Sequence, residues 1–189
     1  MPESIIGHLP IRPHLLRYVE WREGLSPGHP VVVPGPSIIA VTLNLILVSK
    51  SALLLCSRTR EACLAKCSAR LRYQVTGRRY WHNHIFVTDD SALAFGEFLT
   101  ALLHQDLLDL IIAGQRERRL EKEVIVQFML DTGLDDFIEF DALKQAQFRY
   151  RRKIGYVHHR GNQPAGYQLS RQPAQYARRQ PKNIPPTLF

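Results

Sequence analysis

The stretch DDSALAFGEFLTALLHQDLLDLIIAG, residues 89–114, predicts the main helical segment of this chain. Its first three residues, two aspartates and a serine, are typical of helix N-caps, so we expect the helix to begin near Ala92. Apolar side chains then recur with the period of one helical face, at Phe95, Phe98, Leu99, Leu102 and Leu103. The same period reaches the polar Asp106. We therefore expect a kink or restart at residues 104–106, before the helix continues to Gly114.

Two runs before this helix predict a β-hairpin. Residues 69–75 alternate apolar side chains with Arg and Gln, which is the period of a half-buried strand. Residues 76–79 have the composition of a turn, and residues 80–88 are rich in aromatic and β-branched side chains. We therefore expect residues 69–75 to pair with residues 80–88.

The segment upstream of the hairpin leaves its secondary structure open. Residues 38–48 form the most apolar run of the chain, and so short a run suits either a buried strand or a buried helix. A bilayer-spanning helix needs about 20 apolar residues, so this run is too short to cross a membrane. Residues 57–68 have the composition of a helix.

Residues 116–154 predict two further helices joined by a short link. Residues 116–132 are good helix formers, and Gly133 suits the left-handed conformation of a helix C-cap. Apolar side chains occupy two sides of this first helix, so we expect both sides to be covered, which favours a homodimer. After the polar link 134–136, a second helix should begin at Phe137 or Glu139 and run to Ile154. Two helices around a tight turn are typical of a helix-turn-helix.

The second helix of this pair has an apolar side and a basic side. We expect the buried side to hold Leu143, Ala146, Tyr150 and Ile154. The opposite side carries Gln145, Phe148, Arg149 and Arg152, with Lys144 and Arg151 flanking them. Arg can read guanine, Gln can read adenine, and further cations neutralise phosphates. Helix electrostatics alone would produce the same gradient, because acidic side chains favour the start of a helix and basic ones its end.

The charge of the chain is concentrated at its C-terminal end. After Asp141 there are ten Lys or Arg and no Asp or Glu, whereas the preceding residues hold fifteen basic and seventeen acidic side chains. The net charge of +8 is therefore local. Such a field attracts polyanions, with nucleic acid as the first partner class and an anionic membrane surface as the second.

The prolines predict where regular structure lies. Seven of the twelve fall in residues 1–36 and five in residues 164–189, with none between. Because proline interrupts helices and central strands, we expect an extended Pro-rich arm at residues 1–36 and a globular domain at residues 37–154. Residues 155–189 should form a basic flexible tail. The arm should contact the domain through its apolar side chains, which are Ile5, Ile6, Leu15, Leu16 and Trp21.

Three short patterns carry a resemblance to a known group of proteins. They are FMLDTGL at residues 128–134, IEFDAL at residues 138–143 and FRYRR at residues 148–152. They resemble the C-terminal part of small uncharacterised proteins from bacterial mobile elements and prophages, and more distantly helix-turn-helix activators of the Mor type. The resemblance covers about 40 residues and implies DNA binding.

Metal and catalytic chemistry have little support in the sequence. Cys56, Cys63 and Cys67 lack a Cys-x-x-Cys pair and a fourth ligand, so we expect reduced, mostly buried thiols. His82 and His84 lack a third ligand at a recognisable spacing. We find no Gly-rich phosphate loop, no nucleophile elbow and no His-Glu-x-x-His motif. We expect no metal, no cofactor and no enzymatic activity.

These observations predict an α+β protein with a small hairpin, a helical C-terminal half ending in a helix-turn-helix, and extended arms at both termini. We expect a non-catalytic, cytoplasmic DNA-binding protein, regulatory or architectural in role and without a signal peptide. The predicted contact residues are Lys144, Gln145, Phe148, Arg149, Arg151, Arg152 and Lys153 on the helix, and Arg160, Arg171, Arg178 and Arg179 in the tail. Two alternatives remain. One is a single-strand or RNA binder that uses the hairpin and the tail tyrosines, and the other is a subunit whose basic tail binds an acidic protein.

Overall fold

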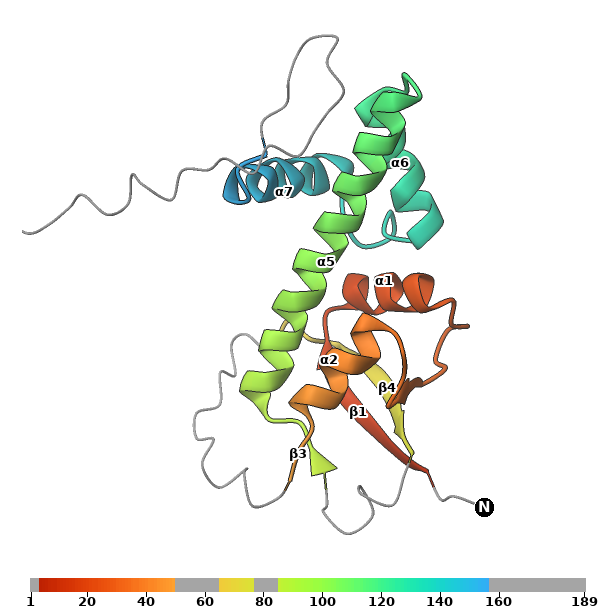
Figure 1. The fold of residues 1–189 in the computed structure, drawn as a ribbon, viewed down its shortest axis with the longest axis vertical. Coiled ribbons are helices and arrows are strands. Elements are labelled where there is room, and N and C mark those ends of the chain that lie inside the picture. The colour runs from red at the N-terminus through yellow and green to blue at the C-terminus, as the bar shows by residue number, and fades with distance from the viewer. Residues whose placement is uncertain (1–3, 50–64, 77–84, 157–189) are drawn as a thin grey trace, which may run out of the picture.

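Helices and two small sheets make up the described part of the chain, so the fold is α+β (Figure 1). A computed structural model describes residues 4–49, 65–76 and 85–156. In chain order the elements are β1 (Ile5–Ile11), α1 (Pro13–Glu23), β2 (Val31–Val33), α2 (Ile38–Ile46), β3 (Val48–Ser49), β4 (Ala69–Val75), β5 (Ile85–Phe86), α5 (Asp89–Arg116), α6 (Glu121–Thr132) and α7 (Phe140–Lys153).

The long helix α5 is continuous, and it begins three residues before the predicted start near Ala92. The residues predicted as N-caps, 89–91, form its first turn instead. Thr88 is its N-cap, and the Thr88 hydroxyl accepts a hydrogen bond from the Ser91 amide at 3.1 Å. The predicted kink near residue 106 is wrong, because the fold supplies polar partners on that face. The Tyr18 hydroxyl of α1 donates to the Asp106 carboxylate at 2.6 Å, and the Arg22 guanidinium forms an ion pair with it. A polar residue on the apolar side therefore does not interrupt the helix.

The main sheet has three strands in the order β1-β4-β2. Strand β1 pairs antiparallel with β4, so that Ile5 lies opposite Val75 and Ile11 opposite Ala69, whereas β2 pairs parallel with β4. The strand predicted at residues 69–75 is confirmed as β4. Residues 80–84 of the predicted second strand lie outside the described residues. The predicted pairing is wrong for the described part, because β1 and β2 lie on both sides of β4, and β5 pairs with β3 instead.

The prediction of an extended N-terminal arm is also wrong, since residues 5–33 supply two strands of the main sheet and one helix. The prolines stand where the fold needs no amide hydrogen. Pro13 opens α1 at its first turn, and Pro10 lies in β1, an edge strand. Of the predicted anchors, Leu15 is buried and Leu16 partly buried, while Ile5, Ile6 and Trp21 are exposed. Here proline marks the ends and edges of elements.

The core lies between one face of the main sheet and the helices α1, α2 and α5 (Figure 1). Its sheet side chains alternate along the strands and are Leu9, Ile11, Val31, Val33, Leu71, Tyr73 and Val75. They pack with buried helix residues, among them Leu15, Tyr18, Ile39, Leu43, Phe95 and Leu99. Residues 38–46 are thus a helix, with Ser37 as its N-cap and Val48–Ser49 as a strand after it. The helix expected at residues 57–68 lies mostly outside the described residues, and residues 65–68 are not helical.

Two glycines give a test of this packing. Gly7 lies opposite Tyr73 in the β1–β4 register, and a Cβ atom on Gly7 would overlap the Tyr73 ring. We expect Gly7→Ala to lower the free energy of unfolding by about 1–3 kcal/mol through overpacking. Gly96 lies inside α5 with nothing near its Cβ position. Gly96→Ala should therefore raise stability by about 0.5–1 kcal/mol. Urea denaturation followed by circular dichroism measures both, and a Gly7→Ala protein as stable as the parent would contradict the β1–β4 register.

Candidate nucleic-acid interface

Helices α6 and α7 follow the predicted pair closely at their inner ends. Gly133 caps α6 with φ of 65°, and its amide bonds to the carbonyl of Leu130. The first helix begins later than predicted, because α5 extends to Arg116 and a turn precedes Glu121. Residues 133–139 connect the helices, and this link is longer than the turn of about 3–4 residues in a helix-turn-helix. The helix-turn-helix stays a prediction.

Helix α7 packs on α5 through a buried polar contact. The Gln147 side chain is fully buried, and its Nε2 donates to the His104 backbone carbonyl at 3.2 Å. Its Oε1 lies 2.9 Å from His104 Nδ1. Because the amide nitrogen must donate to the carbonyl, the amide oxygen is the acceptor. His104 therefore carries its proton on Nδ1 and donates it to Gln147.

A second polar contact extends this one. The His104 ring stacks on Tyr150, with ring centroids 5.4 Å apart. The Tyr150 hydroxyl donates to the Gln105 side-chain oxygen at 2.9 Å. Leu143 is the buried apolar residue of α7. The helix is thus placed on α5 by directional hydrogen bonds, and these define which of its sides faces outward.

The histidines near this contact are shifted toward their neutral form. Burial lowers the pKa of His104, the bond to Gln147 opposes that shift, and the nearby Arg149 adds to it. Burial, together with Arg12 and His104, lowers the pKa of His14 in α1 to about 4. At neutral pH the histidines therefore add no charge at the junction of α1, α5 and α7.

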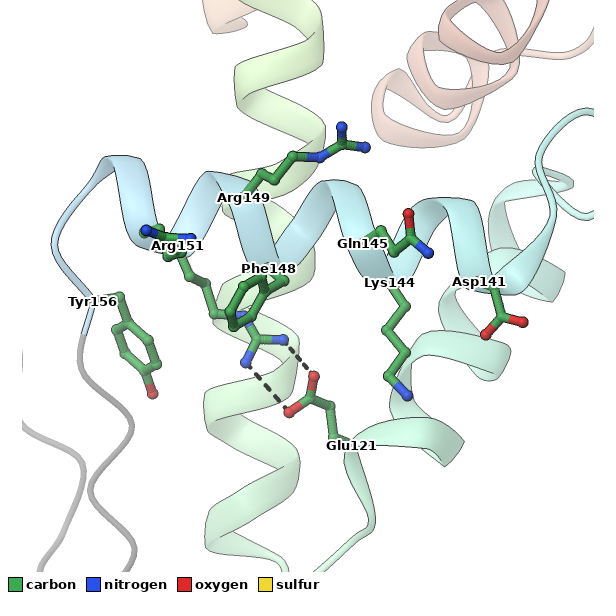
Figure 2. A pocket seen from close by; sticks show the side chains of 9 residues that line it. Glu121, Asp141, Lys144, Gln145, Phe148, Arg149, Arg151 and Tyr156 are labelled. Carbon is green, nitrogen blue, oxygen red and sulfur yellow. Dashed lines mark hydrogen bonds and ion pairs between the residues drawn. The ribbon is translucent and has the colours of Figure 1, made fainter.

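Arg151 has a different role from the one predicted. Its guanidinium binds the Glu121 carboxylate with both terminal nitrogens, one of them at 3.3 Å (Figure 2). The residue is 8% exposed, and no partner for its Nε lies in the described part of the chain. Arg151 thus joins α7 to the first turn of α6. The expectation that it flanks the outward face is wrong, because Glu121 draws it into the helix junction.

The remaining predicted helix residues lie on the outward side of α7. Lys144, Gln145, Phe148, Arg149, Arg152 and Lys153 are all exposed, and Phe148 is 60% exposed. Within the described residues, neither Arg149 nor Arg152 has an acidic partner. The buried side is only partly as predicted. Leu143 is buried, but Ala146 and Tyr150 are half-buried and Ile154 is 39% exposed. The buried side of α7 holds Gln147 and Arg151 together with Leu143.

The exposed side chains of α7 named above, except Lys153, line a groove of about 700 Å³ (Figure 2). The lining residues are Glu121, Asp141, Lys144, Gln145, Phe148, Arg149, Arg151, Arg152 and Tyr156. Four are cations and two are carboxylates, and one carboxylate is already paired with Arg151. The groove is therefore positive and has two aromatic side chains. Glu121 was not predicted, because its partner lies 30 positions away.

Several predicted residues cannot be placed in this groove. Arg160, Arg171, Arg178 and Arg179 lie outside the described residues, as do Cys56, Cys63, His82 and His84. Cys67 is half-buried. In the described ranges, no three His, Cys, Asp or Glu side chains are grouped as a metal site would require. No helix in those ranges is long and apolar enough to span a bilayer.

Comparison of the chain with protein-family models, curated proteins and solved structures finds no match.

Adjacent arginines on α7 provide a matched pair of variants. Arg151→Ala leaves the partly buried Glu121 carboxylate without its partner. We expect it to lower the free energy of unfolding by about 1–3 kcal/mol, less than for a fully buried pair. Arg152→Ala removes an exposed side chain and should change it by less than about 0.5 kcal/mol. Thermal and urea denaturation of both variants measure the difference. Equal effects would contradict the separation of structural and outward-facing arginines.

The low pKa of His14 predicts a pH dependence of stability. Between pH 6.5 and about 4 the unfolded chain binds a proton at His14 that the folded protein excludes. Stability from this group is therefore complete above pH 6.5 and is lost as the pH falls toward 4. We expect His14→Gln to make the fall in unfolding free energy shallower, as measured by urea denaturation at pH 7, 5.5 and 4.5. Parallel curves for the two proteins would refute the assignment.

Proposed function

We propose that this protein is a non-catalytic nucleic-acid-binding protein that contacts duplex DNA with the outward face of α7. The observation that carries the proposal is that one set of α7 side chains packs against the fold while the basic side chains on the other side are exposed. Leu143, Gln147 and Arg151 hold α7 in place. Arg149 and Arg152 face solvent without an acidic partner in the described ranges. Cations that the fold leaves unpaired are available to an anionic partner.

The chemistry of the face suits both base edges and phosphates. Arg149 and Arg152 can donate two parallel hydrogen bonds to guanine or to a phosphate, and Gln145 can pair with adenine. Phe148 can contact a thymine methyl group. Lys144, Lys153 and the tail arginines Arg160, Arg171, Arg178 and Arg179 would hold the backbone. The proposed contact is thus a helix face with a basic tail beside it.

The proposed setting is regulatory or architectural, in the cytoplasm of a bacterium and in a mobile element. That setting rests on the resemblance of residues 128–152 to proteins of prophages. A homodimer would suit a two-fold DNA site. The homodimer is supported by two exposed apolar side chains of α6, because Val126 is 38% exposed and Leu130 is 58% exposed. The other side of α6 is buried.

Single-stranded nucleic acid is the second candidate, and the groove favours it. Phe148 and Tyr156 both line the groove (Figure 2), and Lys144, Arg149 and Arg152 are also among its lining residues. Aromatic side chains among cations can stack on unpaired bases, and each stacked base contributes about 1–3 kcal/mol. A duplex keeps its bases stacked on one another, so Phe148 could contact a thymine methyl group there but could not stack on a base. The two candidates therefore differ in what Phe148→Ala does.

Binding measurements on α7 variants test the proposal. We expect Arg149→Ala and Arg152→Ala to weaken duplex binding by about 1–3 kcal/mol each for a base contact, and less for a phosphate contact. A chain ending at Tyr156 should also lose salt dependence, by about 0.9 in the slope of log K against log salt per phosphate released. Fluorescence anisotropy with duplexes selected from a random-sequence library measures both quantities.

The matched control is Arg119→Ala, because Arg119 is an exposed arginine in the turn between α5 and α6. It removes the same charge and should leave affinity nearly unchanged. Unchanged binding in both α7 variants would refute the duplex proposal. Loss of single-strand affinity in Phe148→Ala, with duplex affinity kept, would favour the second candidate. If no variant alters any nucleic-acid binding, capture of an acidic protein becomes the function to pursue.

A further inference from the structure

The main sheet has a second face, which the core does not use. Alternation along the strands turns Leu9, Leu71 and Val31 toward the helices. It turns the intervening side chains the other way, and these are Ile6, His8 and Pro10 of β1, Val32 of β2 and Arg70, Arg72 and Gln74 of β4. Of these, Ile6, His8, Val32, Arg70 and Arg72 are exposed. We call this set the outer sheet face.

The register gathers the cations of the outer sheet face at one end. Arg70 lies opposite Pro10, and Arg72 lies opposite His8. Gln74 lies between Ile6 and Val32 at the other end. Arg70 and Arg72 are two residues apart on one strand, so their Cα atoms are about 6.6–6.8 Å apart. They form a short row with fixed spacing on the central strand.

The described residues around the three strands contain few acidic side chains that could neutralise Arg70 and Arg72. Residues 24–49 and 65–76 contain no Asp or Glu. In residues 4–23 the acidic side chains are Glu20 and Glu23. Glu20 is buried and engaged, because it accepts hydrogen bonds from the Gly28 amide and the Arg17 guanidinium. Residues 4–19, 24–49 and 65–76, which include the three strands, thus contain basic side chains and no acidic ones.

Arg72 is also held in position. One of its terminal nitrogens donates to the Gly28 carbonyl at 3.1 Å. A guanidinium anchored through one nitrogen keeps further donors for a ligand, and its planar fork matches the oxygens of a phosphate. The exposed Arg70 lies beside it on the same face.

We propose that the outer sheet face is a second binding surface, which holds the backbone phosphates of a nucleic acid. A row of guanidinium groups on a sheet suits a linear anion with repeated phosphates, and the described residues of this face include no Phe, Tyr or Trp that would stack on a base. Contacts there are therefore independent of sequence. The sheet packs at the N-terminal half of α5, whereas α7 crosses α5 further along (Figure 1). The two surfaces are thus separate.

The inference rests on nucleic-acid binding but not on α7, and one set of variants separates the two. We expect Arg70→Gln to lower the slope of log K against log salt by about 0.9, and Arg70→Gln with Arg72→Gln by about twice that. At 50 mM KCl the double variant should bind a mixed-sequence 30-bp duplex at least about tenfold more weakly, because lost phosphate contacts weaken binding most at low salt. Arg70→Lys keeps the positive charge, so it should keep most of the parent's slope of log K against log salt. Arg119→Gln controls for net charge, and circular dichroism checks that each variant is folded.

The outcomes distinguish the two surfaces. A lower slope in the sheet variants, with unchanged binding in Arg149→Ala and Arg152→Ala, would support the outer sheet face and refute the role of α7. An unchanged slope in folded Arg70→Gln protein would overturn the inference whatever the α7 variants do. So would a parent protein that binds no duplex, or one whose Arg70-dependent binding is found only with phosphatidylserine vesicles.

Discussion

Polar groups on the buried side of α5 must find partners, because a buried polar group without one costs about 1–3 kcal/mol. Asp106 is paired by Tyr18 and Arg22 of α1, and His104 is paired by Gln147 of α7. These contacts fall within one helical turn and attach helices from distant parts of the chain. The fold therefore depends on α5 as a continuous helix whose polar residues select the positions of α1 and α7. A kink of α5 at this turn would separate α1 and α7 from their polar partners on α5.

The contact between α5 and α7 also determines what α7 shows to solvent. With Leu143, Gln147 and Arg151 facing inward, the side chains between them must face outward or sideways. Arg151 is drawn in by Glu121 of α6, whereas its neighbour Arg152 is exposed. The positive groove beside α7 thus follows from structural hydrogen bonds, and the proposed binding face costs the fold little.

Sequence patterns predicted those elements whose signals are local. The strand β4, the Gly133 cap and the position of α7 each depend on neighbouring residues, and all are confirmed. The helix α5 is also present, although it begins three residues before the predicted start. Sequence patterns were misleading where the structure of a segment depends on residues far away in the chain. The prolines of residues 1–36 suggested an extended arm, although Pro10 lies in an edge strand and Pro13 opens a helix. The hairpin expectation paired neighbours in sequence, but β4 takes its partners from residues 5–33.

The same distinction applies to the candidate site. Residue order alone determined the excess of basic charge after Asp141 and the outward placement of Gln145, Phe148, Arg149 and Arg152, because helical periodicity and charge need no distant partner. Tertiary structure alone decided that Arg151 is structural, that Gln147 is buried, and that Arg70 and Arg72 lie on the face of β4 opposite the core. Each of these depends on a group many positions away, namely Glu121, His104 or the paired strands. Local sequence cannot specify such partners, because the chain brings them together only when it folds.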